Sequence, residues 1–265
     1  MTAVDVNNIA PFKYKYTIGT LVTDLKEYQE MLLSFEQAGF TQDQAEFIFV
    51  DNTSSNQYDA YQGLNKIITA AQGEYIILCH QDIVLTHDKE RVLSTCIEQI
   101  TQQDSDWALL GNAGGYNKPH IQYRRITDPL TSNASQGDFP CKARSLDEDF
   151  ILLKAEANLG FSKNLTGFHL YGTDICLQAD LKGFNAYVIN FHLTHKSSGS
   201  RSKAFYSSKK ALIKKYCHAF RGRFINTTCT YFYLSSSRWL TWLIQSRYMD
   251  KRIRRWSKRF IRWFT

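Results

Sequence analysis

The stretch Gly73-Glu74-Tyr75-Ile76-Ile77-Leu78-Cys79-His80-Gln81-Asp82 is apolar in its middle and polar at its end. A short apolar run between turn-forming residues is typical of a buried β-strand. We therefore predict a strand over Tyr75–Cys79. Its carboxyl end then presents His80, Gln81 and Asp82 together.

Similar runs occur on both sides of this strand, with amphipathic helices between them. The predicted strands are Tyr16–Val22, Glu46–Val50, Trp107–Leu110, Phe150–Lys154 and Ala186–Ile189, and the predicted helices are Leu25–Ala38, Tyr58–Ala71, Lys89–Thr101 and Thr173–Leu181. Alternating strands and helices indicate crossover units on a parallel sheet. We expect an α/β domain over residues 1–200 with a mostly parallel central sheet. The polar segment 111–146 is expected to be loop-rich.

Polar residues follow two of the predicted strands directly. Ligands of parallel sheets bind beyond the carboxyl ends of the strands. Asp82, beside His80, is suited to hold a divalent cation against a diphosphate, because Mg²⁺ and Mn²⁺ favour oxygen ligands and keep substrate phosphates in their shell. Asp51 and Asn52 are suited to bind a base edge or ribose hydroxyls. The plainer alternative is turn formation, in which Asp82 only caps the next turn.

Two later groups add candidates. Asp174 lies near the start of a predicted helix, where it is either a base that deprotonates an attacking hydroxyl or a first-turn acid favoured by the helix dipole. His195 follows a short strand and either completes a metal site or has a structural role. A flexible Ser/Gly run follows it.

In their order, these stretches resemble the family 2 glycosyltransferases, and more closely a bacterial glycosyltransferase-like subfamily. The matching stretches are Phe49–Asn56, Ala60–Asn65, Gly73–Asp82, Leu146–Phe150, Gly167–Leu177 and His195–Ser200. The resemblance covers residues 14–200. It implies the A-type glycosyltransferase fold, a single nucleotide-binding domain, and inverting transfer from a nucleotide diphosphate sugar, with a UDP-sugar expected.

The resemblance also implies roles for individual residues. Asp174 matches the catalytic base of the family's E-D motif. Asp82 matches the last acid of its D-x-D motif, with His80 and His195 as further ligands of Mn²⁺ or Mg²⁺. The residues implied at the donor are Thr20, Val22, Asp51, Asn52, Tyr61, Asn65, Gln81 and Asp82, and those implied at the acceptor are Asp147, Glu148 and His169.

The sequence departs from the family pattern at two positions. His80 replaces the first acid of the D-x-D motif, and Thr173 replaces the acid of the E-D motif. Imidazole is a poorer partner than carboxylate for Mg²⁺, so the first change favours Mn²⁺. The second leaves Asp174 itself in place.

The charge is distributed unevenly along the chain. Residues 1–200 hold 15 Lys+Arg and 24 Asp+Glu, whereas residues 201–265 hold 17 Lys+Arg and one Asp. One helical face of the tail is apolar and carries Met249, Ile253, Trp256, Phe260, Trp263 and Phe264. This pattern predicts a helical C-terminal region, residues 201–265, that binds an anionic membrane surface. Packing on the domain and nucleic-acid binding are the alternatives, and the acidic domain disfavours nucleic acid.

Other features narrow the class of protein. The sequence contains no run of about 18 apolar residues, which a membrane-spanning helix would need, and the N-terminus does not resemble a secretory signal. The six cysteines are scattered without a C-x-x-C pair, which favours reduced thiols. We expect a cytoplasmic enzyme, peripheral on the inner face of the membrane, that uses a saccharide or lipid-linked acceptor in lipopolysaccharide or capsule synthesis. A nucleotidyltransferase and a non-catalytic membrane-attached binding module are the alternatives.

Overall fold

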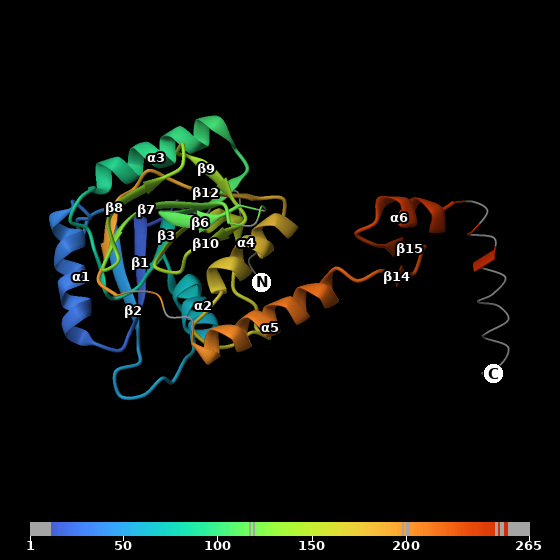
Figure 1. Ribbon diagram of the computed structural model, residues 1–265, viewed down its shortest axis with the longest axis horizontal. Coiled ribbons are helices and arrows are strands. Elements are labelled where there is room, and N and C mark those ends of the chain that lie inside the picture. The colour runs from blue at the N-terminus through green and yellow to red at the C-terminus, as the bar shows by residue number, and fades with distance from the viewer. Residues whose placement is uncertain are drawn as a thin grey trace, which may run out of the picture. The chain divides into compact units, whose positions relative to one another are not determined.

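The computed structural model describes residues 12–116, 118, 120–197, 199, 202–246, 249 and 252–253 (Figure 1). Tertiary contacts divide the chain into two units, residues 1–209 and 210–265. The domain boundary expected at residue 200 stays a prediction.

A seven-stranded sheet forms the centre of the first unit. Its strand order is β2 (Ala45–Asp51), β1 (Tyr14–Val22), β3 (Gly73–Cys79), β11 (Phe150–Lys154), β5 (Trp107–Gly111), β12 (Asn185–Val188) and β9 (Cys141–Ala143). Strands β2, β1 and β3 are parallel, as are β5 and β12, but β11 is antiparallel to both of its neighbours. The predicted α/β class is therefore confirmed, whereas a mostly parallel sheet is not, since the sheet is mixed.

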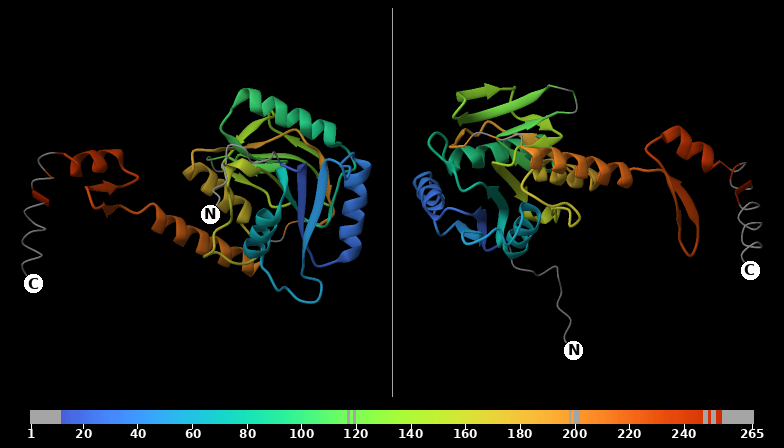
Figure 2. Two further views of the ribbon diagram at one scale, coloured as in Figure 1. Left: turned by 180° about the vertical axis from the view of Figure 1, so that it is seen from behind. Right: turned by 60° about the horizontal axis from the view of Figure 1, so that its bottom comes forward.

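Helices cover both faces of this sheet (Figures 1 and 2). Tyr16 and Ile18 of β1 share one buried cluster with side chains of α1 (Leu25–Gln37) and α3 (Glu90–Gln103). The alternate residue Gly19 faces α2 (Ala60–Ala70), where a Cβ atom would lie 2.2 Å from Ile67 Cγ2. Gly172 of α4 (Tyr171–Leu181) adjoins Ile151 of β11, so α4 lies on the same side of the sheet as α2. The layered core contributes about 1.5–3 kcal/mol per fully buried large apolar side chain.

The segment expected to be loop-rich contains strands, and this expectation was wrong. Strands β6 (Ala113–Gly115), β7 (Gln122–Asp128), β8 (Thr131–Gln136) and β10 (Ser145–Leu146) join β4 (Ile83–Val84) and β13 (Leu193–His195) in a second sheet. Most side chains of β8 are polar and exposed, so backbone pairing rather than apolar periodicity specifies the strand. This sheet sets His195 opposite Ile83, next to Asp82.

The second unit begins within α5 (Lys203–Ala219) and contains a hairpin, β14 (Arg223–Asn226) and β15 (Tyr231–Leu234), followed by α6 (Arg238–Ile244). The C-terminal region is thus not helical throughout. Trp239 and Trp242 of α6 are 66% and 68% exposed. Most of the apolar face predicted over 249–264 lies outside the described residues. Within the described part of the chain, no helix combines the length and apolar character that crossing a membrane requires.

Candidate active site

A cavity of about 250 Å³ opens at the carboxyl ends of β1 and β3. It is lined by Leu21, Thr23, Glu27, Asn52, Ala60, Leu64, Leu78, Cys79, His80, Gln81, Asp82, Phe168 and Tyr171. The strand ends supply polar groups, and α2 supplies an apolar wall. This is the sheet edge at which the sequence predicts a ligand.

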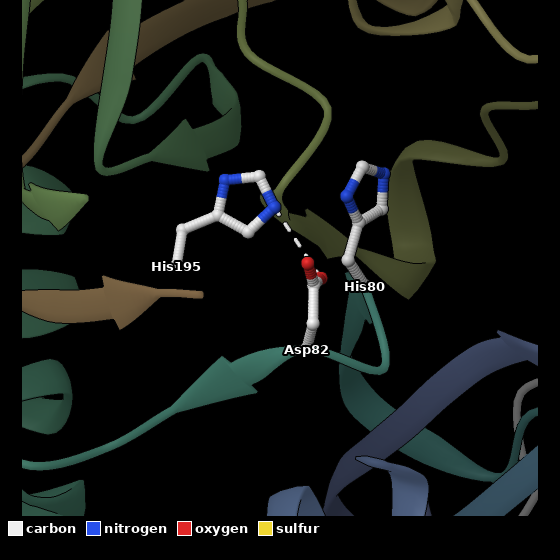
Figure 3. Close-up of side chains that lie close together, drawn as sticks. All are labelled: His80, Asp82 and His195. Atoms are coloured by element: carbon white, nitrogen blue, oxygen red, sulfur yellow. Dashed lines mark ion pairs between the residues drawn. The ribbon is translucent and has the colours of Figure 1, made fainter. Parts of the chain in front are cut away.

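Three side chains at this edge could hold a cation. His80, Asp82 and His195 each offer one ligand atom, and these atoms lie within 4.8 Å of one another. Figure 3 shows the three side chains converging, with an ion pair of 3.3 Å between His195 Nε2 and Asp82 Oδ1. Two imidazole nitrogens and a carboxylate oxygen suit a first-row divalent cation, with Mn²⁺ favoured over Mg²⁺. Below, these three residues are called the His-Asp-His triad.

Burial and hydrogen bonds set the protonation of the triad. Burial acts to raise the pKa of Asp82, but hydrogen bonds from His195 and Ser197 outweigh it, so the pKa is lowered. Burial and, to a smaller extent, the neighbouring His195 lower the pKa of His80 to about 4. Asp82 is therefore anionic and His80 neutral at pH 7, which are the forms that bind a cation.

Tyr171 fixes the orientation of His80. The Tyr171 hydroxyl donates to the backbone carbonyl of Glu148 at 3.0 Å, and the same oxygen lies 2.8 Å from His80 Nε2. Because a carbonyl oxygen only accepts, the Tyr171 proton points to Glu148, and His80 Nε2 must donate. This tautomer leaves a lone pair on His80 Nδ1, where a metal ligand needs it.

The donor residues implied by the sequence fall into two groups, and the first reaches the cavity. Asn52, Gln81 and Asp82 line it. Gln81 Oε1 accepts from the backbone amides of Thr23 and Asp24, at 2.7 and 3.0 Å. The side chain of Gln81 thus ties the end of β3 to the start of α1.

Asp51 is exposed at the end of β2 but does not line the cavity. Its carboxylate accepts hydrogen bonds from the backbone amide and hydroxyl of Thr53, at 2.9 and 2.7 Å, and these bonds lower its pKa. This contact matches the turn-forming alternative. A role of Asp51 at the nucleotide base stays a prediction.

The second group lies within the fold instead of the cavity. Thr20 and Val22 are fully buried in β1 on the face that packs against α1. Asn65 bonds both backbone groups of Phe161, and the Tyr61 hydroxyl donates to the His169 carbonyl at 3.0 Å. The structure therefore does not bring Thr20, Val22, Tyr61 or Asn65 into the cavity lining.

Comparison with known proteins places this chain in a family. No protein-family model matches the sequence. A protein of Fuscovulum blasticum called ATP synthase subunits region ORF 6 is 33% identical over 216 residues, which cover 80% of this chain and 87% of that protein. The chain belongs to the ORF 6 family. The name of this relative states no activity.

The fold of this ORF 6 family member resembles that of S. aureus TarS. TarS 1-349 in complex with UDP-GlcNAc has a TM-score of 0.50 and 12% identity, over 71% of this chain and 60% of that chain. A further TarS crystal structure has a TM-score of 0.49 and 12% identity, over 88% of this chain and 46% of that chain. This chain thus spans less than two thirds of the TarS chains it matches, and the likeness concerns the fold.

The acceptor residues implied for this ORF 6 family member lie beside α4. Burial and the neighbouring Asp147 raise the pKa of Glu148 to about 8, although backbone amides of Leu170 and Gly172 oppose this shift. Desolvation also raises the pKa of Asp147, although the residue still reaches solvent. The His169 ring packs edge-on against Phe205, with ring centroids 5.7 Å apart.

Asp174 is buried near the start of α4. Its side chain is 0% exposed, and it does not line the cavity. Its two carboxylate oxygens accept from the backbone amide and the hydroxyl of Ser162, at 2.8 and 2.7 Å. These contacts match the alternative of a first-turn structural acid, and the role of Asp174 as catalytic base stays a prediction.

The cavity residues that sequence reasoning did not assign to the site in this ORF 6 family member include Glu27, Phe168 and Tyr171. Phe168 and Tyr171 belong to the matched stretch 167–177, so their aromatic character was the available signal. Glu27 lies in the first turn of α1, where an acid is expected for the helix dipole alone. Only the packed structure shows that its side chain turns toward the cavity.

Proposed function

We propose that this chain is an inverting glycosyltransferase that transfers a sugar from a UDP-sugar to an acceptor hydroxyl with the help of Mn²⁺ or Mg²⁺. The observation that carries this proposal is the His-Asp-His triad at the edge of a cavity at the strand ends. A diphosphate bound there lies at the sheet edge where α/β folds bind nucleotides.

The charges around the cavity favour a cation-bound donor. Among the described residues that line it, the carboxylic acids are Glu27 and Asp82, and the imidazole is the neutral His80. A diphosphate carries negative charge and is repelled by these acids unless a cation lies between them. A bound Mn²⁺ would neutralise the charge that develops on the leaving diphosphate, acting as a Lewis acid.

The remaining cavity residues suit the nucleoside. Asn52 is buried and held by two hydrogen bonds to the backbone of Tyr58, so its position is fixed. Leu64 and the exposed ring of Phe168 offer apolar surface for a base or sugar face. The choice of UDP follows the TarS complex with UDP-GlcNAc, in which that protein binds this nucleotide sugar.

The basic C-terminal region supports a membrane-bound site of action. With 17 Lys+Arg and one acid over 201–265, and with two exposed tryptophans on α6, it suits a surface of anionic lipid. We propose peripheral binding to the cytoplasmic face and a saccharide or lipid-linked acceptor of lipopolysaccharide or capsule synthesis. Deletion of residues 247–265 should weaken sedimentation with anionic liposomes at low salt, and unchanged sedimentation would remove this part.

A screen of nucleotide sugars tests the reaction itself. The full chain is incubated with UDP-, GDP- and dTDP-sugars and a mixed acceptor fraction, with Mn²⁺ or with a chelator, and the released nucleotide is measured. We expect release from a UDP-sugar in the presence of Mn²⁺ and loss of release with the chelator. Absence of release from every donor would refute the proposed function.

A further inference from the structure

The side-chain amide of Gln81 at the cavity edge has all of its hydrogen-bonding groups engaged. Its Oε1 atom accepts from the backbone amides of Thr23 and Asp24, at 2.7 and 3.0 Å. Its Nε2 atom donates to Thr23 Oγ1 at 3.1 Å and to Glu27 Oε2 at 3.0 Å. A primary amide has two donor hydrogens and two acceptor lone pairs, and these contacts use them all. Gln81 therefore positions its neighbours and has no hydrogen-bonding group left for a ligand.

The two side chains that Gln81 holds each keep one group for a ligand. Glu27 Oε2 is bonded to Gln81, whereas no hydrogen bond within the described residues engages Glu27 Oε1. Thr23 Oγ1 accepts from Gln81, so its own hydroxyl proton is left to donate. Both residues line the cavity. A carboxylate oxygen and a hydroxyl donor are thus held close together through one amide nitrogen.

The start of α1 holds Glu27 in place from the backbone side. Asp24 is the N-cap of this helix, and its carboxylate accepts from the amides of Lys26 and Glu27, at 2.8 and 3.3 Å. The cap fixes the backbone of Glu27, while Gln81 fixes the far end of its side chain. Because the side chain is held at both ends before a ligand arrives, binding to it costs little conformational entropy.

The strand order along the sheet edge indicates which part of a nucleotide meets this pair. The order is β2-β1-β3, and Asn52 follows β2, Thr23 follows β1 and Asp82 follows β3. With the diphosphate at the His-Asp-His triad, the nucleoside extends along the edge toward β1 and β2. A nucleotide has its base, ribose and diphosphate in this same sequence. The ribose therefore falls at the end of β1, beside Thr23 and Glu27.

We propose that Glu27 and Thr23 bind the cis-2′,3′-diol of the donor's ribose, an assignment that rests on the proposed function. One ribose hydroxyl donates to Glu27 Oε1, and the other accepts from the Thr23 hydroxyl. In dinucleotide-binding α/β folds an acid likewise accepts from a ribose hydroxyl. The carboxylate also repels phosphate from this place, which keeps the diphosphate at the triad. The pair therefore favours a ribonucleotide donor over a 2′-deoxyribonucleotide donor.

Glu27→Gln is the variant that changes the site least in shape. Its amide oxygen can accept from Gln81 Nε2, so that contact is kept while an NH₂ group replaces the cavity-facing carboxylate oxygen. Glu36→Gln, on the exposed side of α1, is the matched control. Each protein is compared with itself, UDP against deoxy analogues of UDP. A change in Mn²⁺ affinity then cancels, because the diphosphate is the same in every nucleotide.

Calorimetry on the full chain with Mn²⁺ measures the Kd of UDP, 2′-deoxy-UDP and 3′-deoxy-UDP. In the wild type we expect at least one deoxy analogue to bind about 10–100-fold more weakly than UDP, since it lacks a hydrogen bond to a charged group. In Glu27→Gln this ratio should fall by about fivefold or more, and in Glu36→Gln it should be unchanged. If Glu27→Gln does not keep the wild-type melting temperature, Glu27→Ala replaces it.

Failure of the ribose site and failure of the proposed function are distinguishable. A wild-type chain that binds none of the three nucleotides in the presence of Mn²⁺ refutes the proposed function and the ribose site with it. A wild-type chain that binds UDP, but binds both deoxy analogues within about threefold of it, refutes the ribose site alone. A folded Glu27 variant that keeps the wild-type ratio also refutes the ribose site, because Glu27 then does not contact the diol.

Discussion

Replacing Asp174 by asparagine tests whether this acid has a structural or a catalytic role. In the structure this carboxylate is fully buried and accepts two short hydrogen bonds from Ser162, at 2.8 Å from the amide and 2.7 Å from the hydroxyl. These bonds fix the segment before α4 to the first turn of the helix. The asparagine side chain would keep one accepting oxygen and place an NH₂ group where the other oxygen accepts.

The cost follows from these contacts. A hydrogen bond to a charged group contributes about 1.5–3 kcal/mol, and asparagine loses one such bond and weakens the other. We therefore expect Asp174→Asn to lower the free energy of unfolding by roughly 2–4 kcal/mol. For a chain of this size, 1 kcal/mol shifts the melting temperature by about 2–4 °C, so the loss is roughly 4–16 °C.

Urea unfolding measures this effect in four proteins: the wild type, Asp174→Asn, Ser162→Ala and the double variant. A coupling free energy of roughly 1–3 kcal/mol between the two residues supports the structural role. At a temperature where the variant is folded, its kcat should stay close to that of the wild type. A variant with unchanged stability and abolished transfer would refute this reasoning and restore Asp174 as the base.

Three further changes have defined outcomes. Tyr171→Phe removes the hydroxyl that orients His80, and we expect Mn²⁺ affinity, measured by calorimetry, to fall about 10–100-fold; unchanged affinity would contradict this. Gly172→Ala forces a Cβ atom against the Leu146 carbonyl, 2.2 Å away, and should cost about 1–3 kcal/mol in urea unfolding. His192 is 3% exposed, and burial lowers its pKa to about 4. The unfolded chain binds this proton at about pH 6.5, so stability falls as the pH drops from there toward 4. Between pH 7 and pH 5, the melting temperature of His192→Gln should therefore fall less than that of the wild type. An equal fall in both proteins would exclude His192 as the source of the pH dependence.

The sequence predicted the strand ends well because local patterns specify them. The apolar run ending at Cys79 forms β3, and the helix predicted over Leu25–Ala38 is observed as α1, with Asp24 as its N-cap. The convergence of His80 and Asp82 with His195 was implied by the resemblance. Its geometry depends on the second sheet, which no periodicity in residues 111–146 indicates.

Burial explains why some of the predicted site residues lie away from the cavity. Thr20 and Asp174 were both expected in the site, but both are fully buried. Sequence position alone cannot distinguish a strand residue that faces the core from one that faces a ligand, because adjacent residues of a strand point to opposite faces. The left-handed conformation of Leu170 could not be predicted either, because a leucine gives no sequence signal for it.

Calorimetric titration of UDP into the full chain, with Mn²⁺ and with a chelator, tests the central claim that the His-Asp-His triad binds a cation-bound diphosphate. We expect binding at least about tenfold tighter with Mn²⁺, and we expect Asp82→Asn to remove that difference. Equal affinity in the presence of the chelator, or an Asp82→Asn variant that keeps the full response to Mn²⁺, would contradict it.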